Sequence, residues 1–553
     1  MNLKRMILIA FILSGMAALM YEVIWTRPLS MVFGSTTYAL STILAAFMAG
    51  LGLGGYLGGR YADRLKNPAA VYALLELGIG IYAVLLITLF NHLPSLYVSL
   101  YSALHLQFGL FTFVQFIVIF FVLLIPTCLM GATFPVVVKF YTEEKVGTGI
   151  GTLYAGNTLG AMIGSFAAGF ALIPVLGIKW SIVLVGLINL AVGSSILFLS
   201  SPQLTKKVVP VGFVLFLIFA GSASYDIEKF TIGSFYYGST ALAENLEVLF
   251  YREGLYGTVT VVRYGGEKSL MINGKGQGGT GFADVRTNFF LAYLPLLLHP
   301  DPKTSLNIGL GTGTTSGILS QYTHTTTVEI DPAIVEASKS FKDVNKDVLN
   351  QENHRLVLAD ARNYLLLTNE KYDLITSEPA DPWQQRSTML YSKEFFEIIK
   401  NHLNENGLFT QWVPIYEFSA DDFRTLYHTF HAVFPHVVAF GNAGEVETIL
   451  VRENENYWFF GNITPVETEN YIGIKGEENI EIVYVDAGGK EENSRMKTGE
   501  IFVVEKEGTL RITTYRVSEI FLIGSLNEIK INWSEIENKI KERRKRENHE
   551  THN

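Results

Sequence analysis

The chain contains one cysteine, Cys128, among 553 residues, and charged side chains make up only 17% of it. A single cysteine excludes an internal disulfide framework and a cysteine-based zinc site. No His, Cys and Asp cluster has metal spacing either, so no bound metal is expected. The net charge of -9 argues against a nucleic-acid partner. With so little charge, a hydrophobic content of 49% is too high for a purely soluble protein, so a membrane-embedded part is expected.

The long apolar runs are confined to the first 224 residues. They lie at about 6–26, 37–58, 70–91, 109–134, 148–174, 178–200 and 208–223. Each is long enough, or nearly so, to cross a bilayer. The first begins after Lys4 and Arg5 like a signal peptide, but it lacks a clear cleavage site and more runs follow. We therefore expect residues 1–224 to form a multi-pass helical domain of about seven spans in the cell membrane.

Small residues recur at four-residue spacing in this half, which places them on one helix face. The two series are Gly50, Gly54, Gly58 and Gly156, Gly160, Gly164. Such series permit close helix packing in lipid. Ionisable side chains within the runs are few, and Glu76 is the main candidate for a functional one. The pattern favours an anchor or a substrate-delivery bundle over an independent pump.

The orientation of the bundle raises a conflict. Lys and Arg in alternate loops place the N-terminus inside, and seven spans would then place the C-terminal part outside. The α/β half described below is expected to bind a nucleoside-type substrate, which would be found inside the cell, and this places the C-terminal part in the cytoplasm. We give the substrate more weight, and therefore expect an extra span, a re-entrant run within 93–107, or a final run that does not span.

The sequence pattern of the soluble half predicts three segments. Residues 225–303 alternate and turn like antiparallel β-hairpins and form a lead-in. Residues 304–440 alternate strands and helices, the pattern of a parallel sheet with crossover helices, and form a Rossmann-like, methyltransferase-type α/β domain. Residues 441–553 form a β-rich extension with a polar helix and a tail.

Four strand-end signals follow one another in the α/β segment. The stretches are 304–318 (TSLNIGLGTGTTSGI), 328–332 (VEIDP), 358–361 (LADA) and 372–383 (YDLITSEPADPW). A parallel sheet binds a nucleoside at the carboxyl ends of its strands, where glycines admit the ligand and an acid such as Glu329 binds the ribose hydroxyls. Asp360 and Ala361 fit an adenine-binding turn. The loop matches neither a phosphate-binding loop nor a strict G-x-G-x-x-G, so S-adenosylmethionine or its decarboxylated relative fits better than a dinucleotide.

Together these motifs resemble the spermidine synthase family of polyamine aminopropyltransferases, in its membrane-fused form. Further matching stretches are 270–278 (LMINGKGQG), 295–310 (PLLLHPDPKTSLNIGL) and 390–398 (LYSKEFFEI). The resemblance covers roughly residues 245–415. In the membrane half, 21–36 (YEVIWTRPLSMVFGST) and 131–135 (GATFP) resemble the corresponding part of such fused proteins.

The resemblance implies aminopropyl transfer from decarboxylated S-adenosylmethionine, as cosubstrate, to a diamine such as putrescine, giving spermidine and methylthioadenosine. No tightly bound cofactor is implied. Glu378 takes the place of the catalytic aspartate, which accepts the amine proton. The implied amine-binding residues are Asp381, Tyr391, Tyr256 and Gln277, and the implied nucleoside-binding residues are Gly309, Gly311, Thr312, Gly313, Glu329, Asp360 and Ala361. The expected partners are a diamine or polyamine and the lipid bilayer, and a homodimer is left open.

The chain also departs from the family pattern. Thr312 stands where soluble members have an aspartate that holds the charged aminopropyl end. Asp284 is followed by Thr287 and Asn288 where a Tyr-His pair is usual, and Glu378 is longer than the usual aspartate. These departures leave open a methyltransferase that uses S-adenosylmethionine. A polyamine transporter or sensor with a ligand-binding soluble domain is a further alternative.

Overall fold

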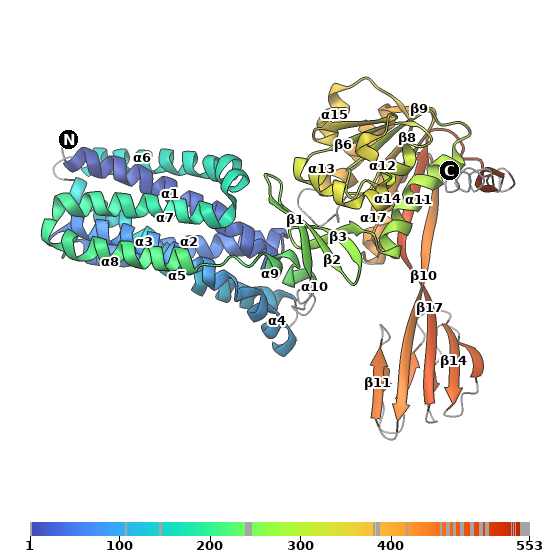
Figure 1. Ribbon diagram of the computed structural model, residues 1–553, viewed down its shortest axis with the longest axis horizontal. Helices are drawn as coiled ribbons and strands as arrows, with labels where there is room; N and C mark the ends of the chain where they lie inside the picture. The colour runs from blue at the N-terminus through green and yellow to red at the C-terminus, as the bar shows by residue number, and fades with distance from the viewer. Residues whose placement is uncertain are drawn as a thin grey trace.

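The chain forms an elongated bundle of apolar helices joined to a mixed α/β domain (Figure 1). The computed structural model describes residues 3–531, 534, 536 and 538–541, except for 105–107, 143–145, 238–245, 380–381, 383–386, 416–417, 454–455, 461–464, 468–471, 476–479, 487–490, 497–500 and 504–507. From 442 to 518 it describes backbone only.

The bundle consists of long helices that run along one another. They are α1 (Leu3–Phe33), α2 (Thr37–Ala62), α3 (Pro68–Phe90), α5 (Phe108–Tyr141), α6 (Val146–Ala167), α7 (Ile173–Ser200) and α8 (Pro202–Ser222). Six apolar helices are long enough to cross a membrane when the continuous 55-residue segment 146–200 is counted once. That segment turns back at Gly177, whose φ of 75° is non-helical, so that α6 and α7 run in opposite directions (Figure 1). Each predicted apolar run therefore coincides with one long helix or with one arm of this segment.

The stretch 93–107 does not contain the extra membrane crossing that a cytoplasmic C-terminal domain would require. It contains α4 (Leu93–Leu104), which at 12 residues is shorter than a bilayer requires. Figure 1 places α4 at the end of the bundle that faces the α/β domain. The final helix α8 has 21 residues, enough to cross. Since α8 runs the length of the bundle, the N-terminus and the α/β domain lie at opposite ends (Figure 1).

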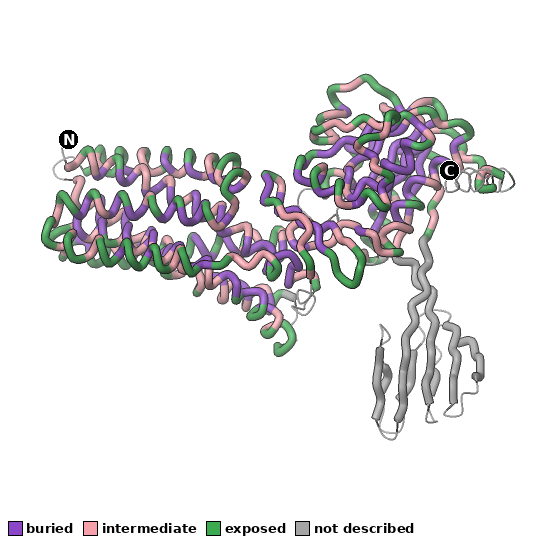
Figure 2. Tube along the Cα trace, viewed as in Figure 1, coloured by how far each residue is buried: buried purple, intermediate pink, exposed green. Residues whose placement is uncertain are grey.

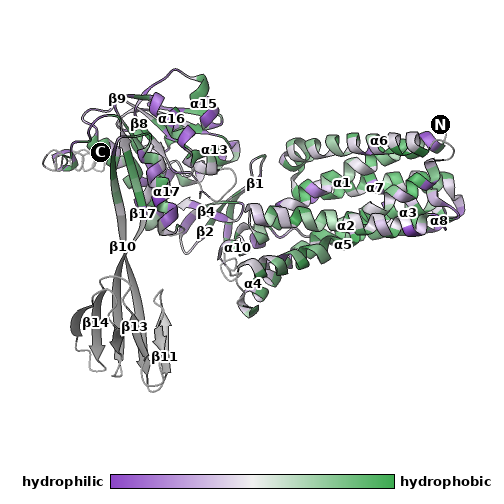
Figure 3. Ribbon diagram, turned by 180° about the vertical axis from the view of Figure 1, so that it is seen from behind, coloured by the Kyte–Doolittle hydropathy of each residue, from purple (hydrophilic) through white to green (hydrophobic). Residues whose placement is uncertain are grey.

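The glycine series pack helices at backbone distance, as predicted. A Cβ built on Gly54 of α2 would collide with the backbone of Cys128 in α5, and one on Gly58 would press on Ala132. On α6, a Cβ at Gly160 or Gly164 would meet backbone carbonyls of α1. Exposed apolar side chains on these helices include Phe166 and Phe170. Figure 3 shows that the residues of the bundle helices are largely hydrophobic. Such a surface is suited to lipid.

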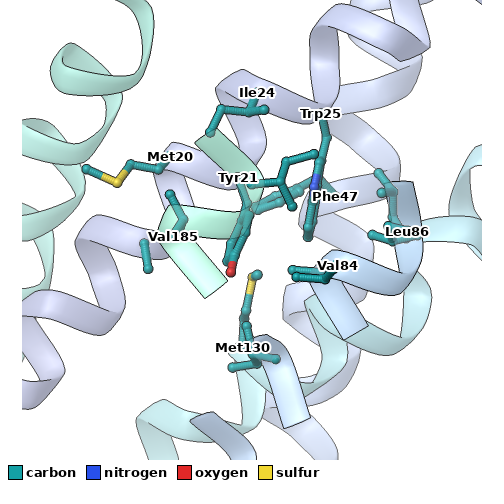
Figure 4. Close-up of a cluster of buried hydrophobic side chains, with 14 of the residues drawn as sticks. Met20, Tyr21, Ile24, Trp25, Phe47, Val84, Leu86, Met130 and Val185 are labelled. Atoms are coloured by element: carbon teal, nitrogen blue, oxygen red, sulfur yellow. The ribbon is translucent and has the colours of Figure 1, made fainter. Parts of the chain in front are cut away.

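Among the described residues, the core of the bundle contains packed aromatic rings and a buried carboxylate, Glu76. Tyr21 and Trp25 of α1 stack with ring centroids 4.8 Å apart, and Figure 4 shows them packed with Phe47 and Met130. Glu76 of α3 is fully buried; it accepts from Ser14 Oγ at 2.5 Å and from Asn189 Nδ2 at 2.7 Å. These bonds tie α1, α3 and α7 together, which gives the polar side chains a packing role.

A short junction connects the bundle to a four-stranded antiparallel sheet. It contains α9 (Ile227–Thr231) and α10 (Ser234–Tyr237), followed by β1 (Glu247–Glu253), β2 (Thr258–Tyr264), β3 (Glu267–Ile272) and β4 (Lys275–Gly279). Gly265, Gly266 and Gly274 have positive φ at the two tight turns, which explains the glycines there. Segment 225–303 is not all strand, because α9, α10 and the 17-residue α11 (Phe282–Leu298) also lie in it.

In the central sheet of the α/β domain, the strands from β17 to β7 have the order β17-β9-β8-β5-β6-β7. The parallel strands are β5 (Thr304–Ile308), β6 (His324–Glu329), β7 (His354–Leu358), β8 (Tyr372–Ser377) and β9 (Leu403–Val413), and the antiparallel pair is β10 (His436–Glu453) and β17 (Gly508–Ser525). The helices beside it are α11, α12 (Thr314–Leu319), α13 (Pro332–Ser338), α15 (Ala361–Leu367), α16 (Lys393–Asn401) and α17 (Ala420–His431). Figure 2 shows the buried sheet beneath them. The C-terminal segment thus returns to supply β17, a strand of this sheet.

We predict that Gly54→Leu destabilises the bundle by at least about 1–3 kcal/mol, because the side chain would enter backbone-to-backbone contact. The matched control is Gly52→Leu in the same helix, where an added Cβ meets nothing within 4 Å. Thermal unfolding and monodispersity in detergent measure the effect. Equal stability of the two variants would show that the packing of α2 on α5 does not depend on Gly54.

Candidate active site

The glycine turn after β5 leaves open space at the end of the sheet. Gly309, Gly311 and Gly313 have φ of 87°, 55° and 86°, a region that side-chain-bearing residues rarely adopt. A Cβ on Gly309 or Gly311 would meet nothing within 4 Å, so a ligand can approach the backbone there. Thr312 is 3% exposed, and its hydroxyl lies 2.9 Å from that of Thr314.

Glu329 connects the end of β6 to this turn. One carboxylate oxygen accepts from Leu310 N and the other from Asp331 N, each at 2.8 Å. The side chain is 4% exposed, and burial raises its pKa while the two backbone N–H groups oppose the rise. Each carboxylate oxygen keeps further acceptor capacity, so the fixed carboxylate can also receive ribose hydroxyls.

Two apolar side chains near Glu329 remain exposed at strand ends. Ile330 follows β6 and is 38% exposed, and Leu358 ends β7 and is 58% exposed. Asp360 caps α15 by accepting from Asn363 N at 2.9 Å, and Ala361 is the first residue of that helix. Exposed apolar side chains beside a helix start suit a planar base, since the first-turn N–H groups have no partner within the helix.

A separate cavity of about 310 Å³ lies beside the end of β8. Fourteen of the described residues line it: Tyr237, Ser269, Met271, Lys275, Gly276, Gln277, Gly278, Asp284, Thr287, Asn288, Glu378, Pro379, Trp412 and Glu519. The cavity therefore joins the predicted residues Gln277 and Glu378 to α11, β9 and β17. Gly278 lies against the methyl group of Thr312, which connects the cavity to the glycine turn.

Glu378 is the carboxylate directly after β8. Burial raises its pKa to about 8, and the nearby carboxylates of Glu519 and Asp284 add to the rise. Burial, Glu519 and Glu267 raise the pKa of Asp284 in the same sense. A carboxyl group with a pKa near neutrality can release and accept a proton under physiological conditions, as a general base must.

The other predicted amine-binding residues lie in different places relative to the cavity. Tyr391 is 8% exposed and donates to the carbonyl of Pro379 at 3.4 Å, so it supports the backbone beside Glu378. Tyr256 lies in the turn between β1 and β2 and is not among the cavity-lining residues. Asp381 lies outside the described residues.

Of the cavity-lining residues, sequence reasoning assigned only Gln277 and Glu378 to the site, and Tyr237, Trp412 and Glu519 are three that it missed. Tyr237 of α10 accepts from Gly276 N at 3.0 Å. Trp412 of β9 packs with Leu291 and Phe521 and also lines the cavity. Glu519 comes from β17, and its two oxygens lie 2.9 and 2.7 Å from Thr287 Oγ1. No motif in the sequence signals these residues, because strand pairing and the junction bring them to Glu378.

Among the described residues, no group of three His, Cys, Asp or Glu side chains is arranged to hold a metal ion. The carboxylates that line the cavity can take part in acid–base chemistry and bind cations.

Comparison with known proteins identifies the family that this chain resembles. The spermine/spermidine synthase domain matches residues 287–443. The polyamine aminopropyltransferase 2 of Aquifex aeolicus is 23% identical over 423 residues, covering 74% of this chain and 79% of its own length. The polyamine aminopropyltransferase of Oceanobacillus iheyensis is 24% identical over 418 residues, covering 71% and 74%.

A crystal structure of spermidine synthase with the transition state analogue AdoDATO matches with a TM-score of 0.33 and 20% identity, covering 35% of this chain and 67% of that one. Residues 225–553 make up about three fifths of the sequence, so a relative matched over 74% of the chain must extend into the apolar helices. The resemblance to the membrane-fused spermidine synthase family is confirmed.

We predict that Glu329→Gln weakens the binding of methylthioadenosine by about 1.5–3 kcal/mol, roughly 10- to 100-fold, because one charged acceptor is lost. Calorimetry measures the affinity, and thermal unfolding monitors the glycine turn separately. The control is Glu336→Gln, which removes only the exposed partner of Arg252. Unchanged affinity in Glu329→Gln would remove this carboxylate from the nucleoside site.

Proposed function

We propose that this chain, which carries a spermine/spermidine synthase domain, is a membrane-embedded polyamine aminopropyltransferase. It transfers an aminopropyl group from decarboxylated S-adenosylmethionine to a diamine such as putrescine, giving spermidine and methylthioadenosine. The observation that carries the proposal is the position of Glu378 between the nucleoside-type edge and a cavity lined by carboxylates.

The order of the strands supports this assignment. The glycine turn, Glu329 and Asp360 follow β5, β6 and β7, which lie on one side of β8, whereas β9 and β17 lie on the other side. We place the donor nucleoside over β5–β7 and the acceptor amine in the cavity toward β9 and β17. Glu378 at the end of β8 then lies where donor and acceptor meet. Holding the two reactants in line at this point supplies much of the rate enhancement.

The chemistry is a displacement at the carbon next to the sulfonium. The acceptor nitrogen forms a bond to that carbon, the carbon–sulfur bond breaks, and its electron pair neutralises the sulfur. Glu378 accepts the proton that the attacking nitrogen must lose. Gln277, Tyr391 and Tyr237 would position the amine and the backbone beside Glu378, and the antiparallel sheet β1–β4 would close the cavity above them.

Thr312 remains a departure from the family pattern. Its side chain is buried and lies beside the hydroxyl of Thr314, so this position offers no carboxylate to the donor's ammonium group. The methyltransferase alternative is nevertheless not favoured. A cluster of carboxylates attracts cationic amines, and the matched relatives are aminopropyltransferases.

The cytoplasmic position of the catalytic domain stays a prediction, and the membrane half provides an argument against it. The end of the bundle away from the α/β domain carries Lys4, Arg5, Arg60, Arg64, Lys66, Lys139, Lys206 and Lys207, and the near end carries Arg27, Lys179 and Lys229. An excess of basic residues marks the cytoplasmic end of a bundle. The supply of donor and the charge distribution therefore favour opposite orientations.

We predict that Glu378→Gln lowers turnover about 10²- to 10⁴-fold while nucleoside affinity persists, because the amide keeps the shape and loses the base. Mass spectrometry of products from putrescine, with decarboxylated and ordinary S-adenosylmethionine in turn, measures the reaction. Methylated putrescine from the ordinary cosubstrate would refute aminopropyl transfer. Near-normal activity of Glu378→Gln would move the base to another residue.

We also predict that the kcat/KM of the wild type rises with pH with a midpoint near 8. Burial and neighbouring carboxylates raise the pKa of Glu378 to about 8. Only the deprotonated carboxylate can accept the proton of the amine, so activity should fall below that pH. The residual activity of Glu378→Gln should not show this rise with pH. Rates from pH 6 to 9.5, compared with Glu336→Gln as control, measure it. If the rise of kcat/KM with pH persists in Glu378→Gln, it reflects the titration of another residue.

Orientation is tested with an impermeant thiol reagent on intact cells. In a variant with Cys128→Ala, single cysteines replace Asp301 of the α/β domain or Asp63 at the far end, whose side chains are 74% and 85% exposed. A cytoplasmic catalytic domain predicts labelling at position 63 and protection at position 301 until the cells are lysed. The reverse pattern would place catalysis outside and refute the cytoplasmic prediction.

A further inference from the structure

A row of buried polar side chains crosses the central sheet at one level. Thr376 of β8 pairs with Asn307 of β5, which pairs with Thr327 of β6. On the other side, Thr376 pairs with Thr410 of β9. Each of these side chains is at most 3% exposed. Strands inside a parallel sheet are normally apolar, and buried polar groups are costly unless they are hydrogen-bonded, so the row needs an explanation.

The row lies one strand repeat below the groups of the candidate active site. Three of its members stand two residues before such a group, and the pairs are Thr376 and Glu378, Asn307 and Gly309, and Thr327 and Glu329. The ladder between β5 and β8 ends where Ile308 pairs with Ser377. Gly309 and Glu378 therefore lie just beyond the last backbone pairing, so the ladder alone does not hold them relative to each other.

Asn307 connects the two strand ends through its side-chain amide. Its Oδ1 accepts from Thr376 Oγ1 at 2.7 Å. Its Nδ2 donates to the carbonyl of Gly309 at 2.7 Å and to Ser316 Oγ of α12 at 2.8 Å. Because the amide uses both of its N–H groups and its oxygen, its orientation is fixed. One side chain thus joins β8, the glycine turn and the helix that follows the turn.

A second buried asparagine holds the far end of the glycine turn. Asn345, which is 2% exposed, donates from Nδ2 to the carbonyl of Thr312 at 2.8 Å. Together with Glu329, which accepts from Leu310 N, the two asparagines hold the turn at three points. Among the described residues, Asn307 is the only one of these three whose side chain is also hydrogen-bonded to a side chain of β8. Asn307 is therefore the link between the turn and the strand that precedes Glu378.

We propose that Asn307 is a positioning residue, which sets the distance between the glycine turn and Glu378 through its hydrogen bond with Thr376. This inference rests on the proposed function, in which the turn holds the donor and Glu378 accepts the proton of the amine. The displacement needs the amine nitrogen, the carbon and the sulfur in line, and a misplacement of about 1 Å can lower the rate about 100-fold. A neutral amide suits this role, because it fixes two backbone segments without adding a charge to the donor site.

Thr376→Val tests the link, because valine keeps the shape of threonine and removes the hydroxyl. We expect kcat to fall about 10-fold while the affinity for methylthioadenosine stays within about twofold, because the turn keeps its bonds to Asn307 and Glu329. Thr376→Ser retains the hydroxyl and should restore most of kcat. Serine fills the core less well than valine, so a substitution that merely loosened the packing would not be rescued by it.

The matched control is Thr410→Val, at the neighbouring position of β9. Thr410 is as buried as Thr376, but its hydroxyl has no hydrogen-bond partner among the described residues. Its removal should leave kcat unchanged. Thermal unfolding confirms that the variants are folded. An unchanged kcat in Thr376→Val, or an equal fall in Thr410→Val, would overturn the role of the link.

Asn307→Asp tests the other side of the same amide. Aspartate removes both N–H donors and can still accept from Thr376, so the carbonyl of Gly309 loses its partner. We expect the affinity for methylthioadenosine to fall about 10-fold, the scale of one hydrogen bond, in contrast to Thr376→Val. Calorimetry measures both affinities. Unchanged affinity in Asn307→Asp would overturn the assignment.

Hydrogen exchange separates failure of this inference from failure of the proposed function. If no amine accepts an aminopropyl group, the proposed function fails. The amides of residues 309–313 should still exchange about 10-fold faster in Thr376→Val than in the wild type or Thr410→Val, because one hydrogen bond beneath the turn is lost. Mass spectrometry of peptides from the substrate-free protein measures this exchange. Equal exchange in the three proteins would overturn the role of Asn307 in either case.

Discussion

The mutual repulsion of carboxylates around one cavity is the constraint on which the rest of the site depends. Asp284, Glu378 and Glu519 share a volume of about 310 Å³, and burial and like charge together raise the pKa values of Glu378 and Asp284. Carboxylates that share one cavity favour the presence of cations there. In the proposed function, a cationic amine gains electrostatic energy on binding, and its charge stabilises the ionised form of Glu378. Substrate recognition and preparation of the base are two consequences of the same interaction.

The sheet produces this arrangement because it brings together segments that are distant in the sequence. Glu378 follows a parallel strand, Trp412 belongs to the next, and Glu519 comes from an antiparallel strand that returns after a long excursion. Parallel strands place the nucleoside residues on one side of β8, and the antiparallel strand extends the sheet on the other. The donor and acceptor regions are thereby separated by the strand that carries the proposed base.

The membrane half is joined to this site by short, specific contacts. Ser35, after α1, lies 3.1 Å from the hydroxyl of Tyr236, and the next residue, Tyr237, lines the cavity. Gly233 N donates to Gly274 O at 2.8 Å, and Arg27 donates to Leu255 O at 2.9 Å. Buried Glu253 of β1 accepts from Ile178 N, where the chain turns at Gly177 into α7. The bundle therefore contacts the segments that carry one wall of the cavity.

The sequence by itself determined the features that depend on local composition and spacing. Apolar runs of bilayer length predicted the long helices. The four-residue glycine spacing predicted close helix packing, which is seen for α2 on α5 and for α6 on α1. The acids that follow apolar runs predicted that Glu329 and Glu378 lie at strand ends, and Glu378 lines the cavity. These follow from periodicity, because one turn of helix or one strand end is specified by neighbouring residues. Tertiary structure decided the rest. Glu519 and Trp412 reach Glu378 through strand pairing, Tyr237 through the junction, and Tyr256 stays in its turn because β1 and β2 hold it there. Contacts between distant segments depend on how whole strands and helices pack, and no short motif contains that information.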